Sequence, residues 1–267
     1  MTGQLVWLIT GTSSGLGRLM TLEALKRGDK VIATTRARSL HKLDDLKQQG
    51  ADVLELEVTA PLEQLHETAQ KAMAIHGGVD VLVNNAGYYC TGALEETTPQ
   101  ETYDQFNTNV FGGLNMNRAF LPYMRARKTG TVVWLGSIAG WISLVNAGLY
   151  TASKAATRLI SMTLNDELAP IGLRSMVFEF GYFRTEFLSA TQRTPRRRTS
   201  ARRSRQRHCG HDDFIRGEGV PKDKKVPTIV HLGTDTLNSV TETCKETLQR
   251  IDEWKDVFVS TDFPKGE

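Results

Sequence analysis

Hydrophobic positions over the first 180 residues alternate between short continuous runs and longer stretches in which apolar residues recur every three or four positions. The continuous runs are rich in β-branched residues and predict buried strands, whereas the spacing of three and four predicts helices. Strict alternation of the two predicts an α/β fold, a doubly wound parallel sheet in a three-layer αβα sandwich. We expect strands at residues 5–10, 31–35, 53–58, 79–84, 131–136 and 175–180, and helices at 16–27, 40–48, 62–76, 103–125 and 150–168.

The alternation ends after about residue 184. Residues 191–225 follow neither period and are rich in Arg, Ser, Thr, Asp and Gly, which predicts a loop or disorder. Residues 226–233 predict a last strand. An amphipathic helix is expected after that strand, because apolar residues again recur at spacings of three and four. These residues are Leu237, Val240, Cys244, Leu248, Ile251, Trp254 and Val257.

Composition places the chain among globular proteins. Its 267 residues are 40% hydrophobic and 24% charged, which suits one domain with a sizeable core. The net charge of +3 is local in origin: eight arginines and no acid lie within residues 191–210, and the other 247 residues carry a net charge of −5. Three scattered cysteines predict a reducing compartment, without disulfides or a metal site. No apolar run approaches the ~20 residues that cross a bilayer, so we expect a cytoplasmic protein with no membrane span.

A glycine-rich turn, residues 10–17, lies between the first predicted strand and the first predicted helix. Gly11 permits a tight turn, Gly15 lets the backbone approach a pyrophosphate, and Gly17 permits close packing of the helix. Free N–H groups at the start of the helix favour a phosphate. The turn resembles the Thr-Gly-x-x-x-Gly-x-Gly motif of the short-chain dehydrogenase/reductase family, which has a Rossmann-like fold. The resemblance implies cofactor contacts from Gly11, Ser13, Ser14, Gly15, Leu16 and Gly17.

Further motifs of that family follow in order, and the resemblance covers residues 5–185. An Asn-Asn-Ala-Gly turn closes the fourth predicted strand, and the resemblance places Asn85, Ala86 and Gly87 against the cofactor. Ser137 ends the fifth predicted strand, thirteen residues before a Tyr-x-x-x-Lys pair. Such a pair alone is a weak signal, but five motifs at compatible spacing are specific. The resemblance implies four catalytic residues, Asn109, Ser137, Tyr150 and Lys154.

The spacing of Tyr150 and Lys154 also has a chemical meaning. A helix places them one turn apart on one face, so the ammonium group lies near the phenol oxygen and favours the phenolate. Lowering the phenol pKa from about 10 to about 7 takes roughly 4 kcal/mol, which Lys154 and an oxidised nicotinamide together supply. Tyr150 is then the general base in alcohol oxidation and the general acid in ketone reduction. We further expect Ser137 to bind the substrate oxygen, Lys154 the nicotinamide ribose, and Asn109 a water that relays protons.

The end of the second predicted strand indicates the cofactor. NAD enzymes of this fold place an acid there, which binds the ribose 2′-hydroxyl, but this chain has Arg36 and Arg38 and no acid. A guanidinium binds a 2′-phosphate, so we expect NADP(H); the alternative is a pair of solvated surface arginines. Glu57 and Val58 stand where the family has an Asp-Val pair at the adenine. The resemblance adds nicotinamide contacts from Phe183 and Thr185.

The residues expected around the substrate are mostly apolar. Such a lining suits a bulky apolar alcohol or ketone, and the C-terminal sequence resembles fungal members of the family in particular. We therefore expect a reaction on a fungal secondary metabolite such as a terpenoid or polyketide. The family commonly pairs its long helices across a two-fold axis, which implies a homo-oligomer, a dimer or a tetramer. The expected substrate-binding residues are Tyr89, Ser137, Trp141, Leu144, Tyr150 and Phe187.

Residues 191–225 stand where the family has a lid over the substrate. They have three interpretations: a disordered basic loop, a patch for nucleic acid or nuclear import, or a segment read out of frame. Arginines without aromatic residues between them are a poor stacking surface, so no specific nucleic acid is expected. We predict one domain over residues 1–267, with a cofactor-binding and catalytic core at 1–185 and a last strand and helix at 226–267. Two alternatives stay open, a non-catalytic NADP-binding protein and a member inactivated by a disrupted lid.

Overall fold

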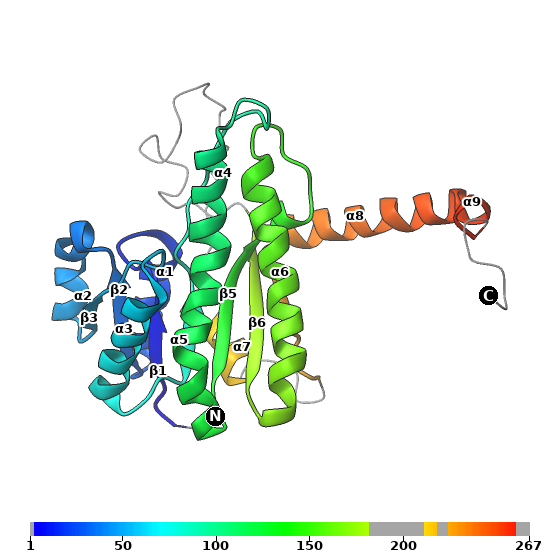
Figure 1. Ribbon diagram of the computed structural model, residues 1–267. Helices are drawn as coiled ribbons and strands as arrows, with labels where there is room; N and C mark the ends of the chain where they lie inside the picture. Colours follow the sequence, from blue (N-terminus) through cyan, green and yellow to red (C-terminus); the bar gives the residue numbers. More distant parts are fainter. Residues whose placement is uncertain (1–2, 182–210, 218–223, 260–267) are drawn as a thin grey trace.

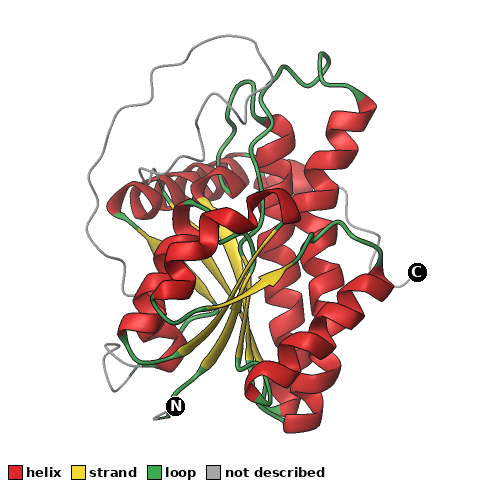
Figure 2. Ribbon diagram, turned by 90° about the vertical axis from the view of Figure 1, so that its left-hand side faces the viewer, coloured by secondary structure: helices red, strands yellow, loops and turns green. Residues whose placement is uncertain are grey.

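The computed structural model describes residues 3–181, 211–217 and 224–259. Seven parallel strands form one sheet in the order β3-β2-β1-β4-β5-β6-β7, and helices cover both of its faces (Figures 1 and 2). This arrangement confirms the doubly wound αβα sandwich. The strands are β1 (Val6–Ile9), β2 (Lys30–Thr35), β3 (Asp52–Glu55), β4 (Val81–Asn84), β5 (Thr131–Ser137), β6 (Arg174–Phe180) and β7 (Ile229–Leu232).

The strand order reverses between β1 and β4. The chain moves outward from β1 to β3 and then returns to place β4 beside β1, which is the point where doubly wound sheets bind their ligands. Just beyond β1, the backbone N–H of Thr10 donates to the carbonyl of Val83 in β4 at 3.1 Å. Strand β3 is shorter than the predicted 53–58, because β2 ends at Thr35 and the carbonyl of Thr35 accepts the last ladder hydrogen bond, from Leu56.

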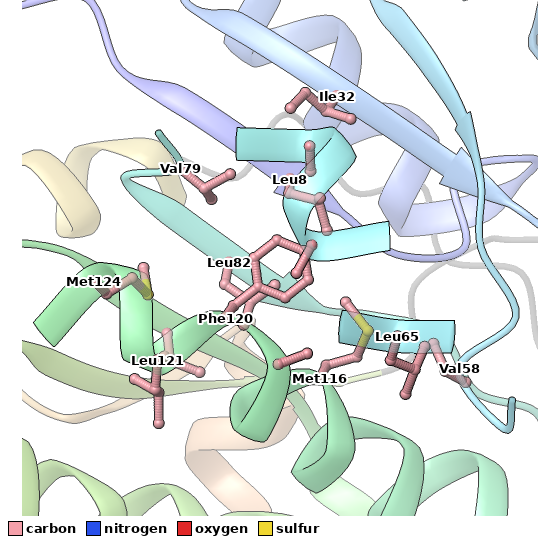
Figure 3. Packing of buried hydrophobic residues seen from close by; sticks show 14 of the residues in the cluster. Leu8, Ile32, Val58, Leu65, Val79, Leu82, Met116, Phe120, Leu121 and Met124 are labelled. Atoms are coloured by element: carbon pink, nitrogen blue, oxygen red, sulfur yellow. The ribbon is translucent and has the colours of Figure 1, made fainter. Parts of the chain in front are cut away.

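Two hydrophobic layers join the helices to the sheet. On one face α3, α5 and α6 pack on the strands, and Figure 3 shows Phe120 and Met116 of α5 against Leu8 and Leu82. On the other face, α1 and α7 pack on side chains such as Trp7. The helices are α1 (Gly15–Lys26), α2 (Asp44–Gln48), α3 (Leu62–His76), α4 (Pro99–Phe106), α5 (Gly112–Arg127), α6 (Gly148–Leu168), α7 (His211–Arg216), α8 (Thr234–Glu253) and α9 (Lys255–Val259), with 3-10 turns η1 (Ala37–Leu43), η3 (Ile138–Gly140) and η4 (Ala169–Ile171).

The prediction of a single helix over residues 103–125 is wrong in two respects: the helix starts earlier, and it is not regular throughout. The helix begins at Pro99, because Thr98 and Glu101 form a reciprocal capping box and proline suits the first helical position. A π-helical turn, η2 (Asn107–Phe111), then separates α4 from α5. A π turn of this kind adds a residue to the helix and is frequent at functional sites.

The prediction of no regular structure over 191–225 is wrong for α7. Ile215 is 1% exposed in the layer beneath the sheet, and its carbonyl accepts a hydrogen bond of 2.6 Å from Arg174 Nη2. Arg216 forms a nearly buried ion pair with Asp29. Residues 211–217 are therefore part of the folded sandwich, although two adjacent apolar residues in a polar stretch are too few to show a period.

The predicted amphipathic helix after the last strand is confirmed as α8, but its apolar stripe is not in the core. Thr236 and Val240 are buried where α8 packs against β7 and η3. Farther along, Leu248 is 66% exposed and Ile251 48% exposed. Figure 1 shows α8 extending away from the sandwich, with α9 at its far end. Most of the stripe therefore faces solvent.

Candidate active site at the carboxyl edge of the sheet

The glycine-rich turn between β1 and α1 is closely packed against the turn that follows β4. Gly11 and Gly15 have φ values of 71° and 61°, a backbone region that side chains other than glycine rarely adopt. A Cβ on Gly17 would clash with the side-chain amide of Asn85 and lie 2.8 Å from the carbonyl oxygen of Gly11. All three glycines are therefore required by the local geometry, as expected from the spacing of the motif.

The first turn of α1 offers its backbone N–H groups without a competing side chain among the described residues. Ser14 is the N-cap, yet its side chain makes no capping hydrogen bond, and the first turn carries no acid. Leu16 packs partly against the core below this turn, which leaves Ser13 and Ser14 at its half-buried rim. Uncapped N–H groups, a positive helix end and a cradle that a Cβ would fill suit a pyrophosphate.

The Asn-Asn-Ala-Gly turn is tied to the glycine-rich turn by backbone and side-chain hydrogen bonds. The hydroxyl of Thr10 accepts from the N–H groups of Asn85 and Ala86 at 3.0 and 2.9 Å. The Asn85 amide donates back to the carbonyl of Thr10 at 2.6 Å. Gly87 packs so closely on Asn109 that a Cβ would lie 3.0 Å from its Oδ1. The two turns therefore form one rigid wall at the switch point.

Asn109 lies in the π-helical turn η2 and is 6% exposed. Its Oδ1 accepts from the backbone N–H of Tyr88, and its Nδ2 donates to the Tyr88 carbonyl, both at 3.0 Å. The same Nδ2 lies 3.1 Å from the hydroxyl of Ser153 on α6. The side chain of Asn109 thus holds the loop after β4 to α6, one residue from Lys154.

Tyr150 and Ser137 lie together at the carboxyl end of β5. Tyr150 is 8% exposed, its ring meets the Tyr89 ring edge to face at 4.8 Å between centroids, and it hydrogen-bonds Ser137. Lys154 Nζ lies 5.7 Å from the centroid of the Tyr150 ring and donates to the carbonyl of Leu135 at 2.6 Å. The structure therefore brings together three of the four residues expected to act in catalysis, with Asn109 behind them.

Without a bound ligand, burial is the main cause of the pKa shifts of Tyr150 and Lys154. It raises the pKa of Tyr150 to about 12, with the Ser137 hydrogen bond opposing and Tyr89 adding to the rise. It lowers the pKa of Lys154 to about 8. The direction for Tyr150 is opposite to the expected one, because removal from water disfavours each charged form and the ammonium group bonds a backbone carbonyl instead of the phenol.

The side chains expected at the adenosine end lie beyond β2 and β3. Arg36 and Arg38 are both exposed, and Arg36 Nε is 3.8 Å from Glu57 Oε2. Glu57 also accepts a hydrogen bond of 3.0 Å from the hydroxyl of Thr59. Val58 is 5% exposed and packs in the core against Gly112. Two cations, Arg36 and Arg38, and one carboxylate, that of Glu57, leave a net positive charge beside the glycine-rich turn.

Only some of the residues expected to bind the substrate lie within the described ranges. Tyr89 contacts Tyr150, while Trp141 and Leu144 are half-buried on the segment that links η3 to α6. Phe183, Thr185 and Phe187 lie outside the described residues, as does the arginine-rich stretch 191–210.

A buried cluster around Glu179 was not anticipated. Glu179 is fully buried in β6, where Trp141 Nε1 donates to it at 2.5 Å and His231 Nδ1 lies 3.0 Å away. Arg158 from α6 lies over the Trp141 ring at 3.9 Å and donates to the Gly140 carbonyl at 2.9 Å. The cluster fixes the turn that carries Ser137. Its only sequence signal was one acid among the apolar residues of 176–180.

The described residues contain no group of three His, Cys, Asp or Glu side chains able to hold a metal ion. Within the same ranges, none of the helices is both long and apolar enough to span a bilayer.

Comparison with known proteins defines the class. The sequence model of the short chain dehydrogenase family matches residues 5–196. The oxidoreductase claN of Passalora fulva is 39% identical over 190 residues, which is 70% of this chain and 86% of that protein. The chain belongs to the short-chain dehydrogenase/reductase family and is an oxidoreductase of that family.

Solved structures agree with this assignment. A short-chain dehydrogenase from Streptomyces avermitilis has a TM-score of 0.80 and 32% identity, and the alignment covers 98% of this chain and 100% of that one. A variant of actinorhodin polyketide ketoreductase with NADPH has a TM-score of 0.65 and 29% identity over 68% of this chain and 72% of that one. The first alignment extends across α8, because only about five residues of this chain are left out.

Proposed function

We propose that this protein interconverts a secondary alcohol and a ketone on a bulky apolar substrate, with NADP(H) as its cofactor. The observation that carries the proposal is the contact of Tyr150 with Ser137 at the carboxyl end of β5, one helical turn from Lys154. This group lies on the same edge of the sheet as the glycine-rich turn, which fits a pyrophosphate.

In the reducing direction, an NADPH held by the glycine-rich turn, Arg36 and Arg38 would supply a hydride to the carbonyl carbon. Ser137 donates a hydrogen bond to the substrate oxygen and holds it beside the Tyr150 hydroxyl. Tyr150 transfers its proton to that oxygen as negative charge develops there, so that one hydride and one proton make the alcohol. In oxidation the phenolate of Tyr150 takes the hydroxyl proton. Lys154 stabilises that phenolate when its ammonium group turns from the Leu135 carbonyl toward the phenol oxygen.

Preference for NADP(H) rests on the charge at the end of β2. Arg36 and Arg38 are exposed there and available to a 2′-phosphate, and no acid follows β2 to repel it. Arg36 gives up only a weak contact, since its 3.8 Å pair with Glu57 is largely exposed to solvent. NADPH is also the nucleotide named with the ketoreductase neighbour.

The proposed substrate is a secondary metabolite of polyketide or terpenoid type, turned over in the cytoplasm. Half-buried Trp141 and Leu144, together with the ring of Tyr89, present apolar surface near Tyr150. The likeness to a polyketide ketoreductase supports this class. A homo-oligomer is proposed as well, in which two copies pair the α5 and α6 faces around a shallow hollow lined by Leu114, Leu121, Pro122, Leu164, Arg118, Arg125 and Glu167.

The experiment is a comparison of Tyr150→Phe with the unmodified protein on a panel of bulky apolar ketones. NADPH consumption is expected to fall at least 1,000-fold in Tyr150→Phe, because the general acid is lost, while NADPH binding measured by fluorescence titration stays within twofold. Tyr103→Phe is the matched control: this tyrosine is 56% exposed on α4, and its loss leaves turnover unchanged.

Equal turnover by wild type and Tyr150→Phe contradicts the proposed role of Tyr150. NADPH binding with no turnover of any ketone or alcohol in the panel favours the non-catalytic alternative or the member with a disrupted lid.

A further inference from the structure

Gln105 is a buried amide on α4 that binds the backbone on both sides of Tyr89. Its side chain is 0% exposed in the last turn of the helix. Its Oε1 accepts from the backbone N–H of Cys90 at 2.8 Å, and its Nε2 donates to the carbonyl of Tyr88 at 2.9 Å. Burying an amide costs free energy unless its polar atoms are paired. These two hydrogen bonds offset that cost and direct the side chain of Gln105 to the residues that flank Tyr89.

A second amide binds the same short segment, residues 88–90, which we call the Tyr89 loop. Asn109 binds both the N–H and the carbonyl of Tyr88, each at 3.0 Å. Residues 85–90 form no helix or strand, so no ladder of backbone hydrogen bonds fixes the loop. The four hydrogen bonds from Gln105 and Asn109 take the place of such a ladder. The conformation of the Tyr89 loop is therefore set by side chains of the helical run formed by α4 and η2.

The ring on this loop contacts the proposed general acid directly. The rings of Tyr89 and Tyr150 meet edge to face, with 4.8 Å between centroids and 62° between planes, a favourable and directional arrangement. Tyr150 also hydrogen-bonds Ser137. Rotation of Tyr150 about its Cα–Cβ bond is the motion that would carry its hydroxyl away from Ser137. A fixed ring beside Tyr150 limits that rotation.

The backbone around the Tyr89 loop is anchored without Gln105. Two residues beyond the loop, the N–H of Gly92 donates to the carbonyl of Asn146 at 3.0 Å. The capping box at the start of α4 secures that helix by itself. Loss of the Gln105 hydrogen bonds is therefore expected to loosen the Tyr89 loop and to leave its surroundings in place.

We propose that Gln105 is a positioning residue for the reaction, which holds the Tyr89 ring against Tyr150 through the backbone of the Tyr89 loop. The packed ring in turn keeps the Tyr150 hydroxyl at Ser137. The inference rests on the proposed role of Tyr150 as general acid and general base. A displacement of about 1 Å in a reacting group lowers the rate up to about 100-fold, so the effect of Gln105 falls on kcat and not on cofactor binding.

Substitution of Gln105 is the first test. Gln105→Met removes both hydrogen bonds at similar side-chain volume and is expected to lower kcat on the ketone panel about 10- to 100-fold, with NADPH affinity within threefold. Gln100→Met is the matched control, because this glutamine is exposed on the same helix and its amide bonds only Asp104 among the described contacts; its kcat stays within twofold. Gln105→Asn repeats the test with an amide one methylene too short to reach both backbone groups.

A double substitution tests whether the effect passes through the Tyr89 ring. Tyr89→Ala leaves the backbone hydrogen bonds of the loop in place and is expected to lower kcat by a factor similar to that of Gln105→Met. Adding Gln105→Met to Tyr89→Ala is expected to lower kcat less than twofold further, because no ring remains to be positioned. A role of Gln105 in stability alone predicts no loss of kcat while the protein stays folded, as checked by circular dichroism and melting temperature.

A measurement without substrate separates this inference from the proposed function. The chain has six tyrosines, so ring-labelled ¹³C tyrosine gives a simple NMR spectrum, in which the Tyr150 resonance is identified by its loss in Tyr150→Phe. Gln105→Met and Tyr89→Ala are both expected to shift or broaden this resonance, since each changes the packing of the neighbouring ring. Gln100→Met is expected to leave it in place.

A lower kcat in Gln105→Met, little further loss in the Tyr89→Ala background and a displaced Tyr150 resonance support the proposal. An unchanged Tyr150 resonance in Gln105→Met, or an equal further loss of kcat in the Tyr89→Ala background, overturns it. So does an unchanged kcat in Tyr89→Ala, a result that does not require either Gln105 variant to fold. Equal turnover by wild type and Tyr150→Phe contradicts the proposed function instead, and the Tyr150 resonance then decides whether Gln105 positions that side chain.

Discussion

Desolvation governs the reactive residues of the candidate site. Tyr150 and Lys154 both lie in the interior, and burial moves the two pKa values in opposite directions, to about 12 and about 8. Spacing alone suggests mutual attraction between phenol and ammonium, but the ammonium group bonds Leu135 and the phenol bonds Ser137. Burial thus shifts both equilibria toward the neutral forms, although Lys154, with a pKa of about 8, is still mostly charged at pH 7.

The lowered pKa of Lys154 predicts a pH-dependent stability. The unfolded chain holds this proton up to about pH 10.5 and the folded chain only up to about pH 8, so between these values the unfolded state binds more protons and the free energy of unfolding rises with pH. Relative to Lys154→Met, wild type is expected to gain about 1.6 kcal/mol between pH 8 and pH 9.5. Urea denaturation at both pH values measures the difference. Parallel pH profiles in the two proteins would contradict it.

Arg36 and Arg38 predict the cofactor preference. Their joint replacement by alanine is expected to weaken NADPH binding about 10- to 100-fold, because charge-assisted hydrogen bonds contribute about 1.5–3 kcal/mol, and to leave NADH binding within twofold. Lys42→Ala, a nearby exposed cation on η1, is the charge control. Isothermal titration with both nucleotides checks the result, and an equal loss for NADH would show that the arginines do not bind the 2′-phosphate.

At the scale of elements, two short segments cannot be predicted from periodicity, although the order of strands and long helices can. These are the π turn η2 and the helix α7. Contacts with distant residues hold each of them: Asn109 of η2 bonds Tyr88, and Arg216 of α7 pairs with Asp29. The segment after the arginine-rich stretch therefore belongs to the same folding unit as β1 and β6.

This placement of α7 predicts a stability effect. Ile215→Ala is expected to lower the free energy of unfolding by about 2–4 kcal/mol, because the side chain is 1% exposed in the core. Leu19→Ala on α1, where the leucine is 53% exposed, is the control and is expected to cost less than about 1 kcal/mol. Chemical denaturation followed by circular dichroism measures both. Equal effects would place α7 outside the cooperative core.

At the scale of the whole molecule, the switch point joins the two halves of the sheet. Thr10 beyond β1 and Asn85 beyond β4 are linked by reciprocal hydrogen bonds, and the glycine-rich turn packs on both. A nucleotide held there contacts residues from each half. Its binding energy is therefore added to the stability of the whole sandwich.

NADPH is accordingly expected to stabilise the protein as one unit. At 100 times its dissociation constant it adds about 2.7 kcal/mol to the free energy of unfolding. Gly17→Ala is expected to abolish this gain, because the new Cβ meets Asn85 and the Gly11 carbonyl. Gly28, unlike Gly17, has a positive φ of 84° and open space around it, so Gly28→Ala is expected to lose some stability and keep the gain. Thermal denaturation with and without NADPH tests both, and a gain that persists in Gly17→Ala contradicts the proposed site.

The amino-acid sequence by itself determined the fold class, the order of the strands along the chain, the glycine-rich turn and the Tyr150–Lys154 spacing, because these depend on local period and on residues close together in the chain. Tertiary structure alone decided which groups Lys154 and Tyr150 contact, where Arg36 and Glu57 meet, and how Glu179 holds Trp141. It also decided that the stripe on α8 faces outward. These features depend on contacts between residues distant in sequence. A periodic apolar pattern predicts that one face of a helix is to be buried, but it does not say whether residues of the same chain will cover that face.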